Sequence, residues 1–272
     1  MTSFVRTQTK AINQCPMTNA EIKHLHSLHQ KKYREKNNTF FVEGATNVLE
    51  CLKTSYKIKV IYGSKQFFDS NKKELEPFMS IFNATSPNEL QRAGTLETNN
   101  SSIALLEIPA THKTLLPDPT SKLVLVFAHI SDPGNFGALI RVADWYGFTD
   151  ILCSKNTVDF FNPKVLHATM GSWSRVNAFY IHLEDYFEKY KNKTEIYGAV
   201  LNGKNLHTTK LNKNGILLIG NEAHGISDTL LKYITVPLTI PRFGKAESLN
   251  VATATAVFCD YFRRTLPKQI KF

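Results

Sequence analysis

Short apolar runs alternate with polar, helix-compatible stretches along the first part of the chain. Four of these runs have the length and composition of strands, at residues 39–44, 58–62, 81–84 and 102–106. Residues 45–54 suit a helix between the first two. The segment 86–89 is typical of a helix start, because Ser86 can cap the helix and Pro87 suits its first position. This alternation predicts a small α/β sandwich.

Residues 18–36 have the pattern of one basic amphipathic helix, with Asn19 as its N-cap. Its apolar stripe consists of Ile22, Leu25 and Leu28. His26 and His29 lie one turn apart, which would suit a metal ion, but no acid or cysteine completes a ligand set. A solvent-facing or RNA-facing surface is therefore favoured over a metal site, and we expect no bound metal.

A second alternation of strands and helices begins after a proline-bearing stretch, residues 109–120, which is typical of a linker. Residues 123–128 form a continuous apolar run, as expected of a strand covered on both faces of a parallel sheet. Further strands are expected at 149–153, 195–200, 216–219 and 233–236, and helices over 138–146, from 162 and over 247–264. The predicted organisation is an α/β domain at 1–108, a linker at 109–120 and a second α/β domain at 121–272.

Composition narrows the class of protein. The 272 residues include 33 Lys and Arg against 23 Asp and Glu, a formal net charge of +10, which favours polyanionic partners such as nucleic acid. The four cysteines are scattered without a C-x-x-C pair, so a disulfide framework and structural zinc are disfavoured. No apolar run reaches membrane-spanning length and the first residues lack the apolar core of a secretory signal, so we expect a cytoplasmic protein with no membrane partner.

Three glycine-bearing loops follow apolar strands in the second half, at residues 132–141, 218–225 and 240–250. None of them fits G-x-G-x-x-G or the P-loop pattern, which disfavours a dinucleotide or nucleoside triphosphate. Each loop alone is more typical of a turn than of a site. Because ligands of open α/β sheets bind beyond the carboxyl ends of strands, the three loops together predict a shared ligand pocket.

These three segments resemble the motifs of the SpoU (TrmH-like) RNA ribose 2′-O-methyltransferases of the SPOUT superfamily. The family patterns D-P-x-N-x-G, G-x-E-x-x-G and I-P-x-x-G-x-x-x-S-L-N are matched from Asp132, Gly220 and Ile240 without gaps. The first half is similar to the family's ribosomal-protein-like α/β substrate-binding domain. However, residues 98–104 lack the proline and glycine of the family's T-P-x-G pattern, so the RNA and the nucleotide stay unassigned.

The resemblance implies that the C-terminal chain threads through a loop to form a deep trefoil knot, which general topology rules would argue against. It also implies that S-adenosylmethionine binds in the knot, largely through backbone groups. The implied cofactor-binding residues are Leu201, Leu218, Gly220, Asn221, Ile240, Pro241 and Leu249.

The resemblance gives the catalytic role to Arg141, with Asn135 beside it, and to Glu222, Ser248 and Asn250. Methyl transfer from a sulfonium is an in-line displacement that needs alignment and polarisation of the ribose hydroxyl. A guanidinium stays protonated in proteins, so we expect Arg141 to stabilise the developing alkoxide rather than to act as a base. The alternative without a catalytic role is that Arg141 only binds a phosphate of the RNA.

The family forms homodimers through the C-terminal domain, so we expect an isologous dimer. Trp145 and Tyr146 favour core or dimer contacts. The first domain is expected to bind structured RNA, ribosomal more than transfer, through Lys23, Lys31, Lys32 and Arg34. The alternatives are a non-catalytic RNA-binding or ribosome-binding module that kept the fold, and a SPOUT enzyme that methylates a base.

Overall fold

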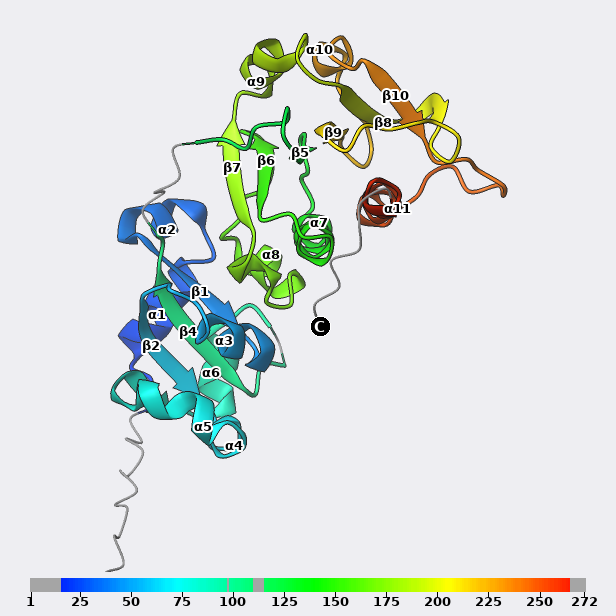
Figure 1. The fold of residues 1–272 in the computed structure, drawn as a ribbon. Helices are drawn as coiled ribbons and strands as arrows, with labels where there is room; N and C mark the ends of the chain where they lie inside the picture. The colour runs from blue at the N-terminus through cyan, green and yellow to red at the C-terminus, as the bar shows by residue number, and fades with distance from the viewer. Residues whose placement is uncertain (1–15, 97, 110–114, 265–272) are drawn as a thin grey trace, which may run out of the picture. The chain divides into compact units, whose positions relative to one another are not determined.

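A computed structural model describes residues 16–96, 98–109 and 115–264. The chain divides into two compact units, Met1–Pro109 and Ala110–Phe272, and each has its own sheet. Figure 1 shows the helices and strands of both units. Part of the predicted linker, residues 110–114, lies outside the described residues. Its last part belongs to the second unit, where the hydroxyl of Tyr186 donates a hydrogen bond to the Pro117 carbonyl over 2.6 Å.

The first unit is an α/β fold around a four-stranded sheet in the order β1-β4-β2-β3. Its strands are β1 (Thr39–Glu43), β2 (Ile58–Gly63), β3 (Phe82–Ala84) and β4 (Ser102–Glu107). Strand β4 pairs antiparallel with both neighbours, whereas β2 and β3 are parallel. The helices are α1 (Asn19–Ser27), α2 (Lys31–Asn37), α3 (Ala45–Cys51), α4 (Lys65–Ser70), α5 (Lys72–Leu75), a 3₁₀ turn (Glu76–Ile81) and α6 (Pro87–Ala93). As predicted, Ser86 caps α6, and Glu89 completes a capping box.

The basic segment at 18–36 is not one helix, as the sequence predicted, but two. Thr18 rather than Asn19 caps α1, and α1 ends at Ser27. Gln30 has extended backbone angles, and the buried guanidinium of Arg34 donates to the Leu28 and His29 carbonyls over 2.7 and 3.0 Å. These bonds satisfy carbonyls at the end of α1, so the chain can turn there before α2 begins.

The second unit contains a six-stranded sheet in the order β10-β8-β9-β5-β6-β7, and every strand pair in it is parallel. The strands are β5 (Leu123–Phe127), β6 (Asp150–Ser154), β7 (Asn177–Ile181), β8 (Ile196–Asn205), β9 (Gly215–Ile219) and β10 (Val236–Thr239). The helices are α7 (Pro133–Trp145), α8 (Pro163–Ala168), a 3₁₀ turn (Ser172–Ser174), α9 (Leu183–Tyr190), α10 (Asp228–Leu231) and α11 (Val251–Arg264). This architecture confirms the prediction of an α/β fold with a parallel sheet.

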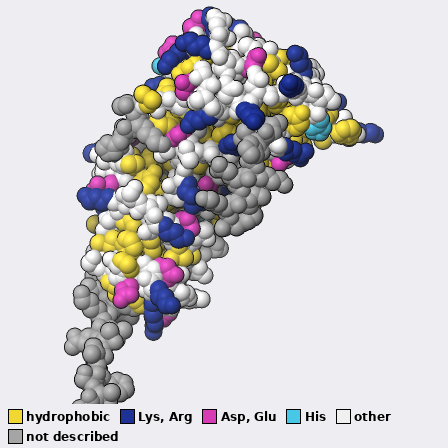
Figure 2. All heavy atoms as spheres, in the orientation of Figure 1, with side chains coloured by type: hydrophobic (Ala, Val, Ile, Leu, Met, Phe, Trp, Pro, Cys, Tyr) yellow, Lys and Arg dark blue, Asp and Glu magenta, His cyan; other side chains and the backbone are white. Residues whose placement is uncertain are grey.

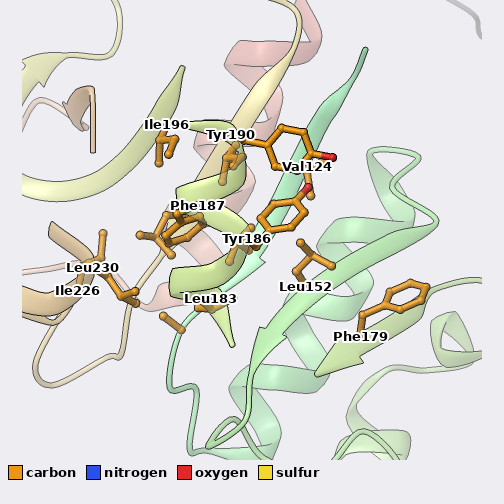
Figure 3. Packing of buried hydrophobic residues seen from close by; sticks show 14 residues of the cluster. Val124, Leu152, Phe179, Leu183, Tyr186, Phe187, Tyr190, Ile196, Ile226 and Leu230 are labelled. Atoms are coloured by element: carbon orange, nitrogen blue, oxygen red, sulfur yellow. The ribbon is translucent and has the colours of Figure 1, made fainter. Parts of the chain in front are cut away.

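One core of the second unit lies where α9 packs on the sheet. Figure 3 shows Leu183 and Phe187 of α9 close to Ile226 and Leu230, with Val124 and Leu152 on the neighbouring strands β5 and β6. Central strands β5 and β9 are buried along their whole length, in agreement with their continuous apolar runs. Strand β7 and helix α9 were not predicted from the sequence, because neither has a strong turn or cap signal beside it.

Two helix starts differ from the sequence prediction, and both concern the glycine-bearing loops. Helix α7 begins at Pro133 and not at 138, because Asp132 accepts a hydrogen bond from the Asn135 amide over 2.7 Å and caps it. Helix α11 begins at Val251 and not at 247, because Asn250 accepts from the Ala252 amide over 2.9 Å. Most of the first motif is therefore helix, and all of the third motif is outside helix.

Three of the four cysteines lie in the described part of the chain, and all three are buried. Burial raises the pKa of Cys51 and of Cys259 to about 12, and raises that of Cys153 further, so these three free thiols stay protonated.

Within residues 16–264, leaving out the undescribed gaps, no group of His, Cys, Asp and Glu could hold a metal ion. None of the described helices has the length and apolar character needed to cross a membrane.

Candidate active site

The three motifs meet at one edge of the parallel sheet. Strand β5 leads into Asp132, β9 leads into Gly220 and β10 leads into Ile240. Because these strands are parallel, their carboxyl ends point the same way. The predicted shared pocket therefore has the right topology for a ligand site of an open α/β sheet.

A chain of side-chain hydrogen bonds joins one residue from each motif. The Asn135 amide nitrogen donates to Glu222 Oε1 over 3.0 Å, and Asn250 donates to Asn135 Oδ1 over 2.8 Å. Residues separated by 87 and 115 positions in the sequence are thus brought together. Each amide in this chain uses both its donor and its acceptor, so the orientation of all three side chains is fixed.

The backbone under this chain is held as well. Asn221 donates to the His129 carbonyl over 2.8 Å, and its Oδ1 accepts from the amides of Ala223 and His224 over 2.9 and 3.0 Å. Reciprocal backbone bonds of 2.9 Å between Asn221 and Gly225 close the turn that carries Glu222. The Glu222 carboxylate is therefore presented by a rigid turn rather than by a flexible loop.

Arg141 lies on the exposed stripe of α7, together with Trp145, whose side chain is 84% exposed. None of the described residues forms a hydrogen bond or an ion pair with Arg141. The guanidinium therefore has all five of its N–H donors available for an anionic ligand. The structure does not join Arg141 directly to the Asn135 chain.

Five of the residues assigned to the cofactor lie at the carboxyl ends of β9 and β10, while Leu201 lies within the neighbouring strand β8 and Leu249 lies just before α11. Thr239 at the end of β10 donates to the Leu201 carbonyl over 2.9 Å, which holds the middle of β8 beside β10. Leu218 and Gly220 are buried, Asn221, Ile240 and Pro241 are half-buried, and Leu201 and Leu249 are exposed. The strand ends thus bring most of the predicted set to one place.

This set fits S-adenosylmethionine chemically. All seven residues are uncharged, which suits a ligand that carries no phosphate and has a cationic sulfur. The turn after β9 approaches closely, since a Cβ on Gly220 would lie 2.3 Å from the Gly225 carbonyl carbon. Only a glycine allows that close approach of the backbone, and Leu201 and Leu249 add exposed apolar side chains to the set.

The third motif differs from the others in its exposure. Every residue from Arg242 to Asn250 is exposed, and Phe243 is 92% exposed. Figure 1 shows this loop projecting between β10 and α11, and Figure 2 shows hydrophobic and basic side chains at the same end of the molecule. Ser248 makes no hydrogen bond to any other described residue, so the structure does not add it to the Asn135 chain.

The residues predicted to bind RNA divide into two groups. Lys23, Lys31 and Lys32 are exposed on α1 and α2. Arg34 is only 2% exposed, and its donors hold the turn between those helices. The prediction that Arg34 binds RNA is therefore wrong, because its guanidinium is buried and donates its hydrogen bonds within the first unit.

His129 is a residue of this edge that the sequence reasoning missed. Its φ is +60°, a left-handed value that is uncommon for a residue other than glycine. The Ser154 hydroxyl accepts from its amide over 2.8 Å, and Asn221 donates to its carbonyl. No sequence signal predicts this conformation, since it depends on contacts with two distant loops.

Known families match both units. Residues 122–260 match the model of the SpoU rRNA Methylase family, and residues 19–103 match the model of the MRM3-like substrate binding domain. The 23S rRNA (guanosine(2553)-2′-O)-methyltransferase RlmP of Bacillus subtilis (strain 168) is 30% identical over 247 residues, which cover 90% of this chain and 96% of that protein.

Solved structures give the same picture. A protein of the TrmH family of RNA methyltransferases from Porphyromonas gingivalis is similar with a TM-score of 0.77 and 31% identity, covering 91% of this chain and 98% of that one. The SpoU methyltransferase AviRb from Streptomyces viridochromogenes, in complex with AdoMet, has a TM-score of 0.77 at 22% identity and covers 91% and 98%. The second likeness shows the fold alone.

Proposed function

Because the chain belongs to the SpoU rRNA methylase family, it is an RNA 2′-O-methyltransferase that uses S-adenosylmethionine, and we propose that it methylates a ribose of ribosomal RNA. The observation that carries this proposal is the hydrogen-bonded chain from Glu222 through Asn135 to Asn250. It joins all three motifs of the family in one rigid arrangement, which a module with only a retained fold would have no need to keep. A ribosomal RNA substrate also fits the cytoplasmic location expected from the sequence.

Arg141 is the residue that we assign to the reacting oxygen. Bound S-adenosylmethionine supplies a methyl group on a cationic sulfur. The ribose oxygen would attack the methyl carbon as the carbon–sulfur bond breaks, which leaves a neutral thioether and releases the hydroxyl proton to solvent. Negative charge develops on the oxygen during this step, and the unpaired guanidinium of Arg141 stabilises that charge. Arg141 does not accept the proton, since its guanidinium stays protonated.

The hydrogen-bonded chain aligns the acceptor ribose. Asn135 and Asn250 have fixed amide orientations, and Glu222 anchors the first of them. Fixed dipoles of this kind position a hydroxyl without a reorganisation cost during the reaction. Ser248, exposed two residues before Asn250, would complete the site from the third motif.

The cofactor would be held by Leu201, Leu218, Gly220, Asn221, Ile240, Pro241 and Leu249. The support is their common edge at β10, β8 and β9 and their lack of charge. In this proposal the chain from β10 to α11 forms the deep trefoil knot of the family. The pairing of β10 with β8 and the hydrogen bond of Asn250 with Asn135 support that path, since they hold both ends of the segment at the sheet.

In this proposal the first unit binds RNA and the second unit forms the dimer. The first, a ribosomal-protein-like substrate-binding domain at 1–108 followed by the linker 109–120, would bind structured RNA with Lys23, Lys31 and Lys32, which are exposed. The second, at 121–272, would form an isologous homodimer. The exposed Trp145 on α7 and the exposed Phe243 in the third motif support a protein partner for this unit, because large aromatic side chains are enriched at interfaces.

Ribose-methylation mapping of total RNA tests the proposal. Cells that lack the gene should lose one 2′-O-methyl mark on ribosomal RNA, and the natural gene should restore it. The Arg141→Ala gene should not restore it, because removing one donor to a developing oxyanion lowers the rate by about 100-fold or more. Purified Arg141→Ala protein should bind S-adenosylmethionine as the natural protein does, with an unchanged melting temperature, since Arg141 is exposed and unpaired.

Other outcomes would assign the protein differently. Unchanged ribose methylation in the deleted cells would favour the non-catalytic binding module. A lost base methyl group would assign the protein to base methylation. Restoration by Arg141→Ala would remove Arg141 from the mechanism.

A further inference from the structure

A cavity of about 440 Å³ lies at the carboxyl ends of β5, β6, β7 and β9, beside the hydrogen-bonded chain. Its polar wall includes His129, Lys155, His182, Asn221 and His224. Of the seven residues assigned to the cofactor, Asn221 alone lines it. The cavity therefore adjoins the cofactor set through one shared residue, and its volume falls within the range of about 300–1,000 Å³ that small-molecule sites occupy.

The chemistry of the wall favours an anion. One lysine and three histidines face the cavity, against one carboxylate, that of Glu184. Lys155 is exposed and forms no ion pair with any other described residue. Serine, threonine and asparagine side chains add hydrogen-bonding groups, while Leu183 and Leu230 form an apolar base that Figure 3 shows as part of the core. A phosphate next to a sugar has this mixture of charge, hydroxyl groups and apolar surface.

Hydrogen bonds also fix the backbone of the cavity wall at His129. His129 keeps its left-handed backbone because Ser154 and Asn221 hold its amide and its carbonyl. The Ser154 hydroxyl donates in turn to Asn156 over 2.6 Å. Strained backbone persists where the surroundings fix it, and it is concentrated at functional sites. The strain here falls on a residue that lines the cavity.

Asn221 connects the cavity to the reacting residues. It lines the cavity, holds His129 and lies 3.4 Å from Glu222 Oε2 through its amide nitrogen. A ligand in the cavity is therefore one residue away from the chain that aligns the acceptor ribose. We propose that this cavity binds the sugar-phosphate of a nucleotide adjacent to the methylated one in the substrate RNA, with Lys155 contacting the phosphate.

This proposal rests on the proposed function, so its test uses methyl transfer and binding together. The substrate is ribosomal RNA from cells that lack the gene, and the enzyme is the full chain. Lys155→Ala should raise KM for this RNA by about tenfold and lower the salt dependence of RNA binding by about one phosphate contact. The kcat and the affinity for S-adenosylmethionine should not change. His182→Ala should raise KM by a smaller factor, and Lys155→Arg should retain the natural KM.

Lys213→Ala is the matched control, because Lys213 is another exposed lysine, just before β9 and therefore at the opposite ends of the parallel strands. It should leave KM and the salt dependence unchanged. If the natural enzyme transfers no methyl group to this RNA, the proposed function fails. If it does and Lys155→Ala behaves like Lys213→Ala, or loses kcat with an unchanged KM, the cavity proposal is overturned and the proposed function stands.

Discussion

The acceptor side of the proposed site (Asn135, Glu222 and Asn250) and its third-motif loop (residues 242–249) are held in opposite ways. On the acceptor side, Asn135, Glu222 and Asn250 are joined by side-chain bonds of 2.8 and 3.0 Å, and the turns beneath them are closed by further bonds. Along residues 242–249, one bond of 3.3 Å from Arg242 to the Ala246 carbonyl is the main internal link among the described contacts. The same motif therefore begins as an exposed loop and ends in a fixed residue.

The difference indicates which part of the chemistry each side serves. Aligning a ribose oxygen requires preorganised dipoles, whose order the protein maintains before the substrate arrives. Enclosing a cofactor or meeting a partner subunit allows a segment to gain order when the ligand binds. Substitutions on the two sides should therefore affect different measurable quantities.

The largest effect is expected at the turn after β9, which carries Glu222 of the acceptor side together with Gly220 and Asn221 of the proposed cofactor set. In Gly220→Val the new Cβ would lie 2.3 Å from the Gly225 carbonyl carbon and 2.5 Å from the Ile226 nitrogen. Relief of such a backbone overlap costs about 3 kcal/mol, which corresponds to a loss of about 100-fold in affinity for S-adenosylmethionine. Isothermal titration calorimetry measures this loss, and far-ultraviolet circular dichroism checks that the variant is folded.

Gly225→Asn is the matched control for that turn. Gly225 has a φ of +67°, which asparagine tolerates, and a Cβ there would meet nothing within 4 Å. Its affinity for S-adenosylmethionine should stay within about threefold of the natural value, since only a modest propensity difference applies. Normal binding by Gly220→Val would show that the cofactor residues are assigned to the wrong place. Should that variant not fold, Leu249→Asp, at an exposed position, tests the same assignment by placing a carboxylate where the cofactor is proposed to bind.

A smaller effect should separate the two functions of Asn250, which caps α11 and holds Asn135. Asn250→Ala loses both, so the free energy of unfolding should fall by about 1 kcal/mol and kcat by about tenfold, the factor that corresponds to about 1.4 kcal/mol of lost alignment. Asn250→Asp keeps the acceptor for the helix amides but has no donor for Asn135 Oδ1. It should melt like the natural protein and yet lose kcat to the same extent.

Thermal unfolding and single-turnover methyl transfer measure the two quantities for both variants. Equal stability losses would mean that the cap does not depend on the side-chain oxygen. Full activity of Asn250→Asp would mean that the link to Asn135 does not align the ribose, and the contrast between the two sides of the site would then lose its functional meaning.

Parts of this arrangement could be predicted from the sequence, and the physical reasons are clear. The apolar runs of β5 and β9 and the turn residues behind them are local signals, so the meeting of three loops at one sheet edge followed from parallel topology. The Ser86 cap was equally local. Arg34 and His129 could not be predicted, because the burial of one and the left-handed backbone of the other depend on partners that only the folded chain supplies.

The start of helix α7 also depends on packing that the sequence does not reveal. Asp132 and Pro133 are a strong start signal, yet the glycines at 134 and 137 favoured a loop. Packing decided the outcome, since a Cβ on Gly137 would lie 2.5 Å from the Ala168 Cβ of α8. Glycine there serves a close helix contact rather than a turn.

The smallest effect is expected in the hydrogen exchange of backbone amides, which should change in the third-motif loop and stay nearly constant on the acceptor side. Amide hydrogen exchange of residues 242–249 should slow by about fivefold or more when S-adenosylmethionine is present at 100 times its Kd, since opening then requires release of the ligand. The amides of residues 135–137, already in helix α7, should change by less than about twofold. Mass spectrometry of peptides from both segments gives the comparison in one experiment. Equal slowing of the two segments would show that the acceptor side is not preorganised, and no slowing of 242–249 would leave a partner subunit as the group that covers the loop.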